Sequence, residues 1–174
     1  TKASRKIKNL KGSKEIARKA NKKLKVAGGW NPSFSSKVKY YGSVGGDKKN
    51  EIIQHSEALL FPVLWHEPLG LAILESMYFG LPVFGTTYGS LPELISKERG
   101  FLSNSKSELA SAIQNIDEYD RRKCHEFIAD NFSSLKMTED YLKLFEEVLN
   151  GNNLNEKPPK TQPSEAQLPF PMYE

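Results

Sequence analysis

The chain has 174 residues, 38% of them hydrophobic and 26% charged, which suits one globular domain with a sizeable core better than two full domains. Its longest apolar run, residues 58–65, is far shorter than the roughly 20 residues that a membrane-spanning helix needs, so none is expected. Its single cysteine, Cys124, excludes an internal disulfide and fits a reducing cytoplasm.

The net charge of +4 conceals an asymmetry along the chain. Residues 1–39 carry 13 Lys or Arg and one acid, a net charge of +12, whereas the rest carries 12 basic and 20 acidic residues, a net charge of −8. Such a basic segment would suit nucleic acid, an anionic membrane surface or a phosphorylated substrate, although a solvated lysine-rich helix face is the simpler interpretation. We therefore expect a cytoplasmic protein and leave open a peripheral membrane contact of the full-length form.

Hydrophobic periodicity predicts the first elements in chain order. Ser13 is a candidate N-cap for a helix whose apolar residues share one face. Two short strands follow, at residues 24–27 and 37–41. Asp47 would cap the next helix, which extends through residue 57 with Ile52 and Ile53 turned inward.

Strands and helices then continue to alternate until the chain becomes helical. The predicted elements are a strand at 58–62, a helix at 70–79, a strand at 82–84, a helical turn at 92–95, a strand at 101–102, and helices at 105–116, 120–131 and 136–149. From Asn152 onward Asn, Pro, Gln, Lys and Glu dominate, which is typical of an extended tail. We divide the chain into a domain at 1–150 and a tail at 151–174.

This alternation predicts an α/β fold with a Rossmann-like parallel sheet covered by helices on both faces. Ligands of such sheets usually bind beyond the carboxyl ends of the strands. The loop that carries Glu67 follows a predicted strand and would lie there.

The most informative motif is a pair of glutamates eight residues apart, Glu67 and Glu75, followed by Gly80-Leu-Pro-Val-Phe-Gly. The first lies in a loop, and the second lies in a helix that begins near Gly70. A loop-to-helix junction offers free N–H groups and the positive end of a helix dipole, which suit a phosphate. A carboxylate further along accepts hydrogen bonds from sugar hydroxyls. The motif therefore predicts a site for a nucleotide-linked sugar.

Other chemistry-bearing residues receive simpler interpretations. The three histidines, His55, His66 and His125, have no ligand spacing and no accompanying cysteine pair, so no metal site is expected. His66 would touch donor or acceptor, or else make a structural hydrogen bond in its loop. Trp30 and Trp65 flank strand ends and are interpreted as packing residues.

An ordered series of motifs resembles the C-terminal domain of GT-B glycosyltransferases, in particular the large retaining group with a Glu-x7-Glu motif. The series spans about residues 11–149 and includes the two glutamates, Gly80-Leu-Pro-Val, Gly89-Ser-Leu-Pro-Glu-Leu-Ile, Gly100-Phe-Leu and Asn131-Phe-Ser. The resemblance implies a sugar nucleotide bound without a metal, in a cleft between two similar α/β domains.

The resemblance also assigns roles to residues of the motif. Glu75 would accept hydrogen bonds from the donor ribose, and Glu67 would contact the donor sugar. The backbone N–H groups of Leu69, Gly70 and Leu71 would meet the diphosphate and the sugar. The two glutamates would therefore not be the acid and base of a glycosidase, because those face one glycosidic bond.

Three basic or apolar positions complete the implied site. Lys11, in Lys-Gly, would neutralise the diphosphate and stabilise it as the leaving group, so that Lys11 and Glu67 are the expected catalytic residues. Val44 would contact the nucleobase. Arg5 would bind the donor, but it lies six residues before Lys11 where the family has five, and Lys6 has the family spacing. The family arginine and the strand before it would otherwise precede residue 1.

The leading hypothesis is the donor-binding half of a retaining hexosyltransferase, which transfers a sugar from a nucleoside diphosphate sugar to an unknown acceptor in glycan or cell-surface polysaccharide biosynthesis. An N-terminal acceptor domain would be its partner, and the chain alone would be inactive. The alternative is a non-catalytic nucleotide-sugar-binding module with a regulatory or scaffolding role. Nucleic-acid binding is disfavoured, because the basic segment contains no recognised module.

Overall fold

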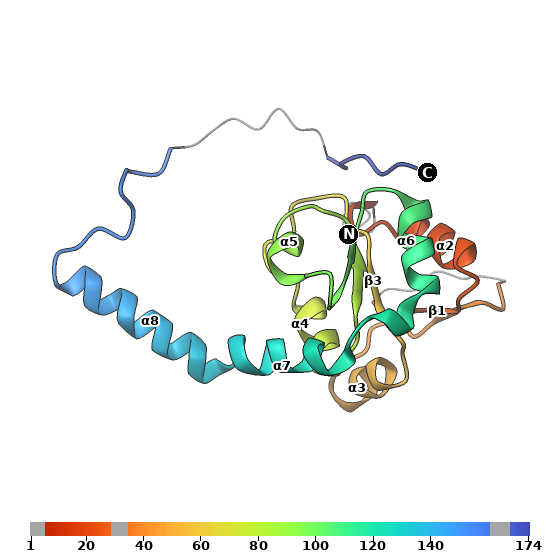
Figure 1. The fold of residues 1–174 in the computed structure, drawn as a ribbon, viewed down its shortest axis with the longest axis horizontal. Coiled ribbons are helices and arrows are strands. Elements are labelled where there is room, and N and C mark those ends of the chain that lie inside the picture. Colours follow the sequence, from red (N-terminus) through yellow and green to blue (C-terminus); the bar gives the residue numbers. More distant parts are fainter. Residues whose placement is uncertain (1–5, 29–34, 161–167) are drawn as a thin grey trace.

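The elements of the domain alternate as the sequence predicts, in a computed structural model that describes residues 6–28, 35–160 and 168–174 (Figure 1). The strands are β1 (Leu24–Val26), β2 (Val38–Tyr40), β3 (Leu59–Phe61), β4 (Val83–Gly85) and β5 (Gly100–Leu102). The helices are α2 (Leu10–Lys19), α3 (Gly46–Gln54), α4 (Leu71–Tyr78), α5 (Leu91–Leu94), α6 (Lys106–Gln114), the 3-10 turn η1 (Ile116–Glu118), α7 (Arg121–Asn131) and α8 (Ser134–Leu149).

The strands pair in parallel, as expected, but they form two sheets rather than one. Strand β1 pairs with β2, and β4 lies between β3 and β5. Within the described residues no hydrogen-bonded ladder joins β1 to β3. Residues of both strands instead line one large cavity between the sheets.

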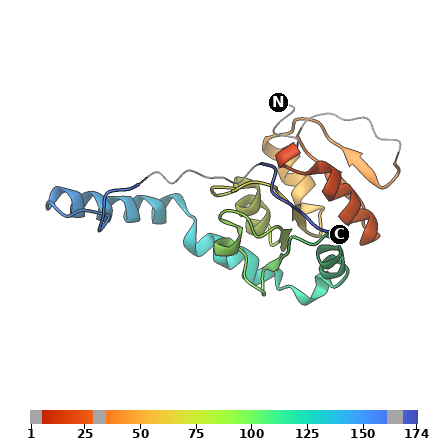
Figure 2. The ribbon, with the colours of Figure 1, turned by 90° about the horizontal axis from the view of Figure 1, so that it is seen from above.

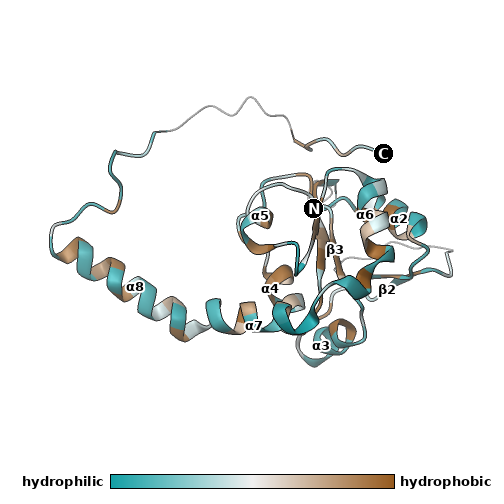
Figure 3. Ribbon diagram, viewed as in Figure 1, coloured by the Kyte–Doolittle hydropathy of each residue, from teal (hydrophilic) through white to brown (hydrophobic). Residues whose placement is uncertain are grey.

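Helices cover both faces of the three-stranded sheet, and β4 is buried along its whole length. Successive side chains of a strand point to opposite faces, so Val83 and Phe84 belong to two separate cores. Val83 packs with residues of α4, α5 and α7, while Phe84 packs with residues of α2 and α6. Figure 3 shows β3 among the most hydrophobic parts of this layered structure.

The start of α2 differs from the prediction that Ser13 is its N-cap. Asn9 caps the helix, in a left-handed conformation with φ of 53°, and its side chain accepts a hydrogen bond from Gly12 N. Ser13 lies inside the helix, where its hydroxyl donates to Asn9 O. Asp47 likewise lies in the first turn of α3, whose N-cap is Gly45.

Helix α8 projects away from the layered domain, and Figure 2 shows the same projection from above. None of its residues is buried. Beyond α8 the chain has no regular element among residues 151–160, yet residues 168–174 lie on the domain near α6. No helix of the described ranges is both long and apolar enough to cross a membrane.

Candidate functional site

The cavity between the sheets has a volume of ≈ 1110 Å³ and collects most of the predicted site residues. The loops after β1, β2 and β3 supply Gly28, Val44 and Glu67 to its wall, so it opens at the carboxyl ends of the parallel strands. Five of the eight predicted residues line it: Val44, Glu67, Gly70, Leu71 and Glu75.

Glu67 is a buried carboxylate with two side-chain partners. Only 8% of the residue is exposed. Lys8 Nζ lies 2.5 Å from its Oε2, and Trp65 Nε1 donates to the same oxygen over 3.1 Å. The Lys8 ammonium also lies 5.0 Å and 5.1 Å from the ring centroids of Phe61 and Trp65. Burial of a carboxylate is costly without such partners, so this cluster fixes the charged group at the cavity wall.

The loop after β4 supports the backbone of the Glu67 loop. Gly89 has φ of +68°, and a Cβ there would lie 2.3 Å from Glu67 N and 2.4 Å from Glu67 O. Ser90 N donates to Glu67 O over 2.8 Å, and the buried Thr86 hydroxyl donates to Val63 O over 2.6 Å. The motif that begins at Gly89 therefore positions Glu67 directly, because only glycine permits this approach.

Gly70 is the N-cap of α4 and adopts φ of +78°. It has no side chain with which to cap the first turn, so the N–H groups of Leu71 and Ala72 are available to a ligand, whereas Ile73 N donates to Gly70 O over 2.8 Å. Leu71, the first helical residue, is 68% exposed. Leu69 does not line the cavity, and its carbonyl accepts a hydrogen bond from the Ser90 hydroxyl over 3.3 Å. Of the three predicted backbone positions, Gly70 and Leu71 thus lie on the cavity wall at the start of α4, and Leu69 does not.

Glu75 lies one turn further along α4 and pairs across the cavity with Lys49 of α3. Lys49 Nζ is 2.5 Å from Glu75 Oε1, and the two side chains are 33% and 41% exposed. Val44 lies shortly before α3, on the same wall. The cavity wall therefore carries two carboxylate–lysine pairs, one whose glutamate precedes α4 and one whose glutamate lies within α4.

Lys11 is not part of this arrangement, in contrast to the prediction. Its side chain is 91% exposed and its nearest acid is Glu15, 4.0 Å away and one turn along α2. The reason is the cap at Asn9, which starts α2 early and turns the first-turn Lys11 toward solvent. Lys8, just before the cap, is the lysine beside Glu67. Arg5 lies outside the described residues, as does Trp30.

Sequence reasoning missed three partners of the carboxylates: Lys8, Lys49 and Trp65. Thirteen basic residues in the first 39 gave no signal that separates Lys8 from its neighbours. Trp65 does pack against the core, as predicted, but its indole N–H is also a hydrogen-bond donor to Glu67.

His66, His125 and Cys124 do not line the cavity, whereas His55 lies on its wall. The His66 ring packs against Phe170 at 4.6 Å between centroids, and His55 and His125 bond to backbone carbonyls. Among the described residues, no group of three or more potential His, Cys, Asp or Glu ligands comes together. Burial raises the pKa of the Cys124 thiol to about 11.

Comparison with known proteins identifies relatives of this chain. The family model described as "Glycosyl transferases group 1" matches residues 8–118. An uncharacterized 41.2 kDa protein in the cps region of Klebsiella pneumoniae is 28% identical over 116 residues, which make up 62% of this chain and 32% of that protein.

Three solved structures share the fold at low identity. AviGT4, a glycosyltransferase involved in avilamycin A biosynthesis, has a TM-score of 0.67 and 21% identity, and the match covers 83% of this chain and 48% of AviGT4. The sucrose-phosphate synthase of Thermosynechococcus elongatus has a TM-score of 0.68 and 20% identity, and the match covers 85% of this chain and 44% of the synthase. Anabaena HepE in complex with UDP and glucose has a TM-score of 0.68 and 16% identity, and the match covers 81% of this chain and 45% of HepE. The chain thus has the expected α/β fold of GT-B glycosyltransferases and spans less than half of each of these structures.

Proposed function

Because the chain belongs to the family of glycosyl transferases group 1, we propose that it binds a nucleoside diphosphate sugar and forms the donor-binding half of a retaining glycosyltransferase. The observation that carries the proposal is the convergence of Val44, Glu67, Gly70, Leu71 and Glu75 on one cavity at the carboxyl ends of the strands. Anabaena HepE, which shares the fold, was solved in complexes with UDP and with UDP and glucose.

The geometry supports a specific order of contacts along the donor. The diphosphate would bind the N–H groups at the start of α4, where the helix dipole favours an anion. Glu75, one turn along the helix, would accept hydrogen bonds from the ribose, and Val44 would contact the base. Glu67 would face the sugar on the other side of Gly70.

The cations of the cavity would neutralise the diphosphate. In this proposal Lys8 takes the role that the sequence suggested for Lys11, because Lys8 lies on the cavity wall whereas Lys11 is directed to solvent. Lys49 supplies a second ammonium beside Glu75. Preorganised charges of this kind stabilise a leaving diphosphate without reorganisation during the reaction. We accordingly propose donor binding that does not depend on a metal.

The acceptor would be held by a second domain, as the partner of this one. This part of the proposal is supported by the length relation, since the chain spans 32% of its curated relative and 48% of AviGT4. The location of the Klebsiella relative in a cps region supports a role in polysaccharide biosynthesis. We expect the chain alone to bind donor without transferring sugar.

Calorimetric titration with UDP, GDP and ADP, with and without EDTA, tests the proposal. We expect one of the three to bind, with an affinity that EDTA leaves unchanged. Glu75→Ala should weaken that binding by about 1–3 kcal/mol, because ribose hydrogen bonds are lost. Glu98→Ala is the matched control, since Glu98 pairs with Lys123 at 2.6 Å on a surface outside the cavity. Absence of binding by all three nucleotides would refute the proposed function.

A further inference from the structure

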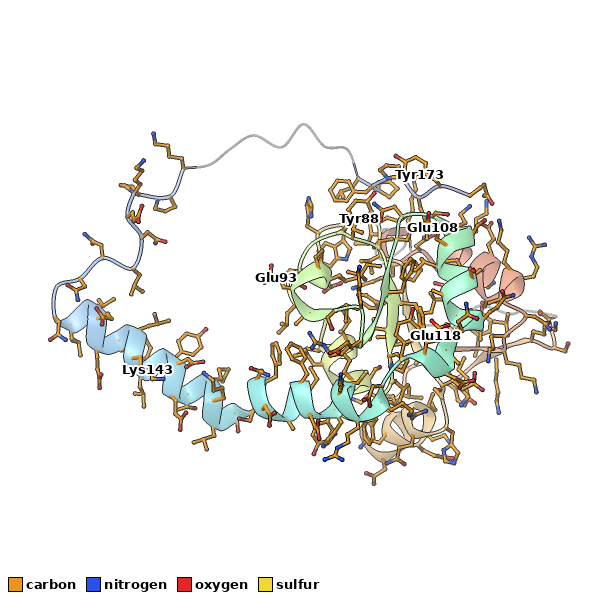
Figure 4. All side chains as sticks on the ribbon, viewed as in Figure 1. Tyr88, Glu93, Glu108, Glu118, Lys143 and Tyr173 are labelled. Atoms are coloured by element: carbon orange, nitrogen blue, oxygen red, sulfur yellow. The ribbon has the colours of Figure 1, made fainter. Side chains whose placement is uncertain are left out.

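Residues 168–174, which we call the strap, lie on the domain as an extended segment with backbone hydrogen bonds to two other loops. Phe170 N donates to Leu64 O over 2.9 Å. Tyr173 N donates to Asn104 O over 2.7 Å, and Lys106 N donates to Tyr173 O over 2.9 Å. The strap therefore joins the loop after β3 to the start of α6, and Figure 4 shows Tyr173 and Tyr88 at this end of the domain.

The side chains of the strap alternate as in a strand that covers a surface. Phe170 and Met172 are partly buried, whereas Tyr173 is 62% exposed. The Phe170 ring contacts the rings of His66 and Tyr88, at 4.6 Å and 4.8 Å between centroids. Met172 packs against the core beneath α2 and α6. This pattern is that of a docked segment with an inner and an outer face.

Polar contacts fix the strap at both sides of this apolar face. The Tyr88 hydroxyl donates to Pro171 O over 2.6 Å. The Glu174 carboxylate lies 2.5 Å from Lys106 Nζ and 3.2 Å from Lys19 Nζ. The strap is thus tied to α2, to α6 and to the loop that precedes α5.

The strap contacts the candidate site at Leu64, at the start of the loop that carries Glu67. Leu64 donates its N–H to Ile7 O over 2.7 Å and accepts at its carbonyl from Phe170 N. Ile7 precedes Lys8, the partner of Glu67, and His66 is the residue before Glu67. Leu64 is therefore hydrogen-bonded on one side to the segment that carries Lys8 and on the other side to the strap. No residue of the strap lines the cavity, so the strap borders the site without filling it.

We propose that the strap is a positioning element of the donor site: it holds residues 64–66 so that Glu67 keeps its orientation toward the donor sugar. The proposal rests on the proposed function for the ligand, while the positioning of the loop stands on the contacts alone. Phe170 is its central positioning residue, because it contacts both Leu64 and His66.

The experiment compares the full chain with a chain that ends at residue 167 and with Phe170→Ala. Leu168→Ala is the control within the strap, because Leu168 is 55% exposed and makes none of these ring contacts. Amide hydrogen exchange at residues 64–67, measured without ligand, is expected to accelerate by about ten-fold or more in the first two variants and to stay unchanged in the control. Tyr88→Phe, which removes the hydroxyl bond to Pro171 but keeps the ring, should give an intermediate acceleration.

A synthetic peptide of residues 168–174 provides the rescue and guards against a variant that misfolds. Added in excess to the shortened chain, it should restore slow exchange at residues 64–67. Exchange that stays slow without the strap, or that the peptide leaves fast, overturns the proposal. This readout needs no nucleotide, so it decides the role of the strap even if the proposed function fails.

Titration of the same variants then examines the ligand side, with whichever of UDP, GDP and ADP binds the full chain and with the glucose conjugate of that nucleotide. We expect the affinity for the nucleoside diphosphate to change by less than about two-fold, since Glu75 and the α4 terminus are intact, and the preference for the glucose conjugate to be lost. A gain in affinity for either nucleotide on removal of the strap would make it a plug and would also overturn the proposal.

Discussion

Lys8 Nζ lies 2.5 Å from Glu67 Oε2, and this pair joins the segment before α2 to the loop after β3. Both groups contact the aromatic side chain of Trp65, which donates a hydrogen bond to the carboxylate and lies under the ammonium. The charge at Glu67 is therefore held by one particular lysine of a lysine-rich segment.

Lys8→Met should destabilise the domain by about 1–3 kcal/mol, because it leaves the buried Glu67 carboxylate without its cation. It should also weaken nucleoside diphosphate binding. Lys11→Met is the matched control three residues away and should be close to neutral for both properties, since Lys11 is 91% exposed. Urea unfolding and calorimetry check this, and a larger loss from Lys11→Met than from Lys8→Met would contradict the assignment.

Gly89→Ala should cost clearly more stability than Gly151→Ala. Both glycines have positive φ, of +68° and +81°, so both substitutions carry backbone strain of about 1 kcal/mol. Only at Gly89 would the new Cβ collide with the backbone of Glu67, whereas nothing lies within 4 Å at Gly151. The difference between the denaturation midpoints of the two variants measures the cost of the collision, because the backbone strain is common to both. Equal midpoints would show that the loop of Gly89 and the loop of Glu67 are not in tight contact.

The Cys124 thiol should resist alkylation in the native protein at pH 8 and react once the chain is denatured. Its pKa is raised from 9.0 to about 11 by burial, so the thiolate is scarce in the folded state. Between these two values the unfolded chain loses its proton first, and stability should therefore fall as the pH rises from 9 to 11, by up to about 2–3 kcal/mol. Cys124→Ala would remove this dependence, and rapid iodoacetamide labelling of the native chain would contradict it.

Docking of the strap should weaken in acid. The Lys106 and Lys19 ammonium groups lower the pKa of the Glu174 carboxyl below its usual 4.5. A lowered pKa means that the ion pairs contribute above the usual value and are lost as the pH falls through the lowered one. Fluorescence anisotropy of a labelled, amidated peptide of residues 168–174 on the shortened chain measures this. A Glu174→Gln peptide should bind more weakly at neutral pH and lose this part of the pH dependence; an identical acid response of both peptides would exclude Glu174 as its source.

The sequence predicted the order and type of the elements well, because apolar spacing and glycines mark short buried strands and amphipathic helices. Val83 and Phe84 read as a buried strand, and each lies in a separate core. The start of α2 was predicted wrongly, because Asn9 and Ser13 are both residue types that commonly cap helices. The first residue of the helix depends on the left-handed backbone conformation of Asn9, which the spacing of apolar residues does not reveal.

The site was predictable where the motif itself contributes backbone or carboxylate, and not where long side chains converge from elsewhere. Glu67, Gly70 and Glu75 line the cavity because a strand–loop–helix unit fixes their relative positions. Lys8 and Lys49 come from other elements, 59 and 26 residues away from their partners, and their flexible stems reach the site only in the folded arrangement. The contacts of Phe170 with the Glu67 loop also form only in the folded arrangement. The sequence carried no signal for them, because the segment that carries Phe170 has the composition of a solvated tail.

The absence of a ladder between β1 and β3 in the described residues also has a consequence for motion. A two-stranded sheet is marginally stable, so β1 and β2 should open and close as a local unit while the three-stranded sheet stays intact. The cavity lies across this seam, with Val44 and Lys49 on one side and Glu67 and Glu75 on the other. A nucleotide that contacts both sides would hold the two-stranded sheet against the three-stranded sheet. Its binding should slow hydrogen exchange in β1 and β2 more than in β4, and equal slowing in all three strands would show that the domain opens as one body.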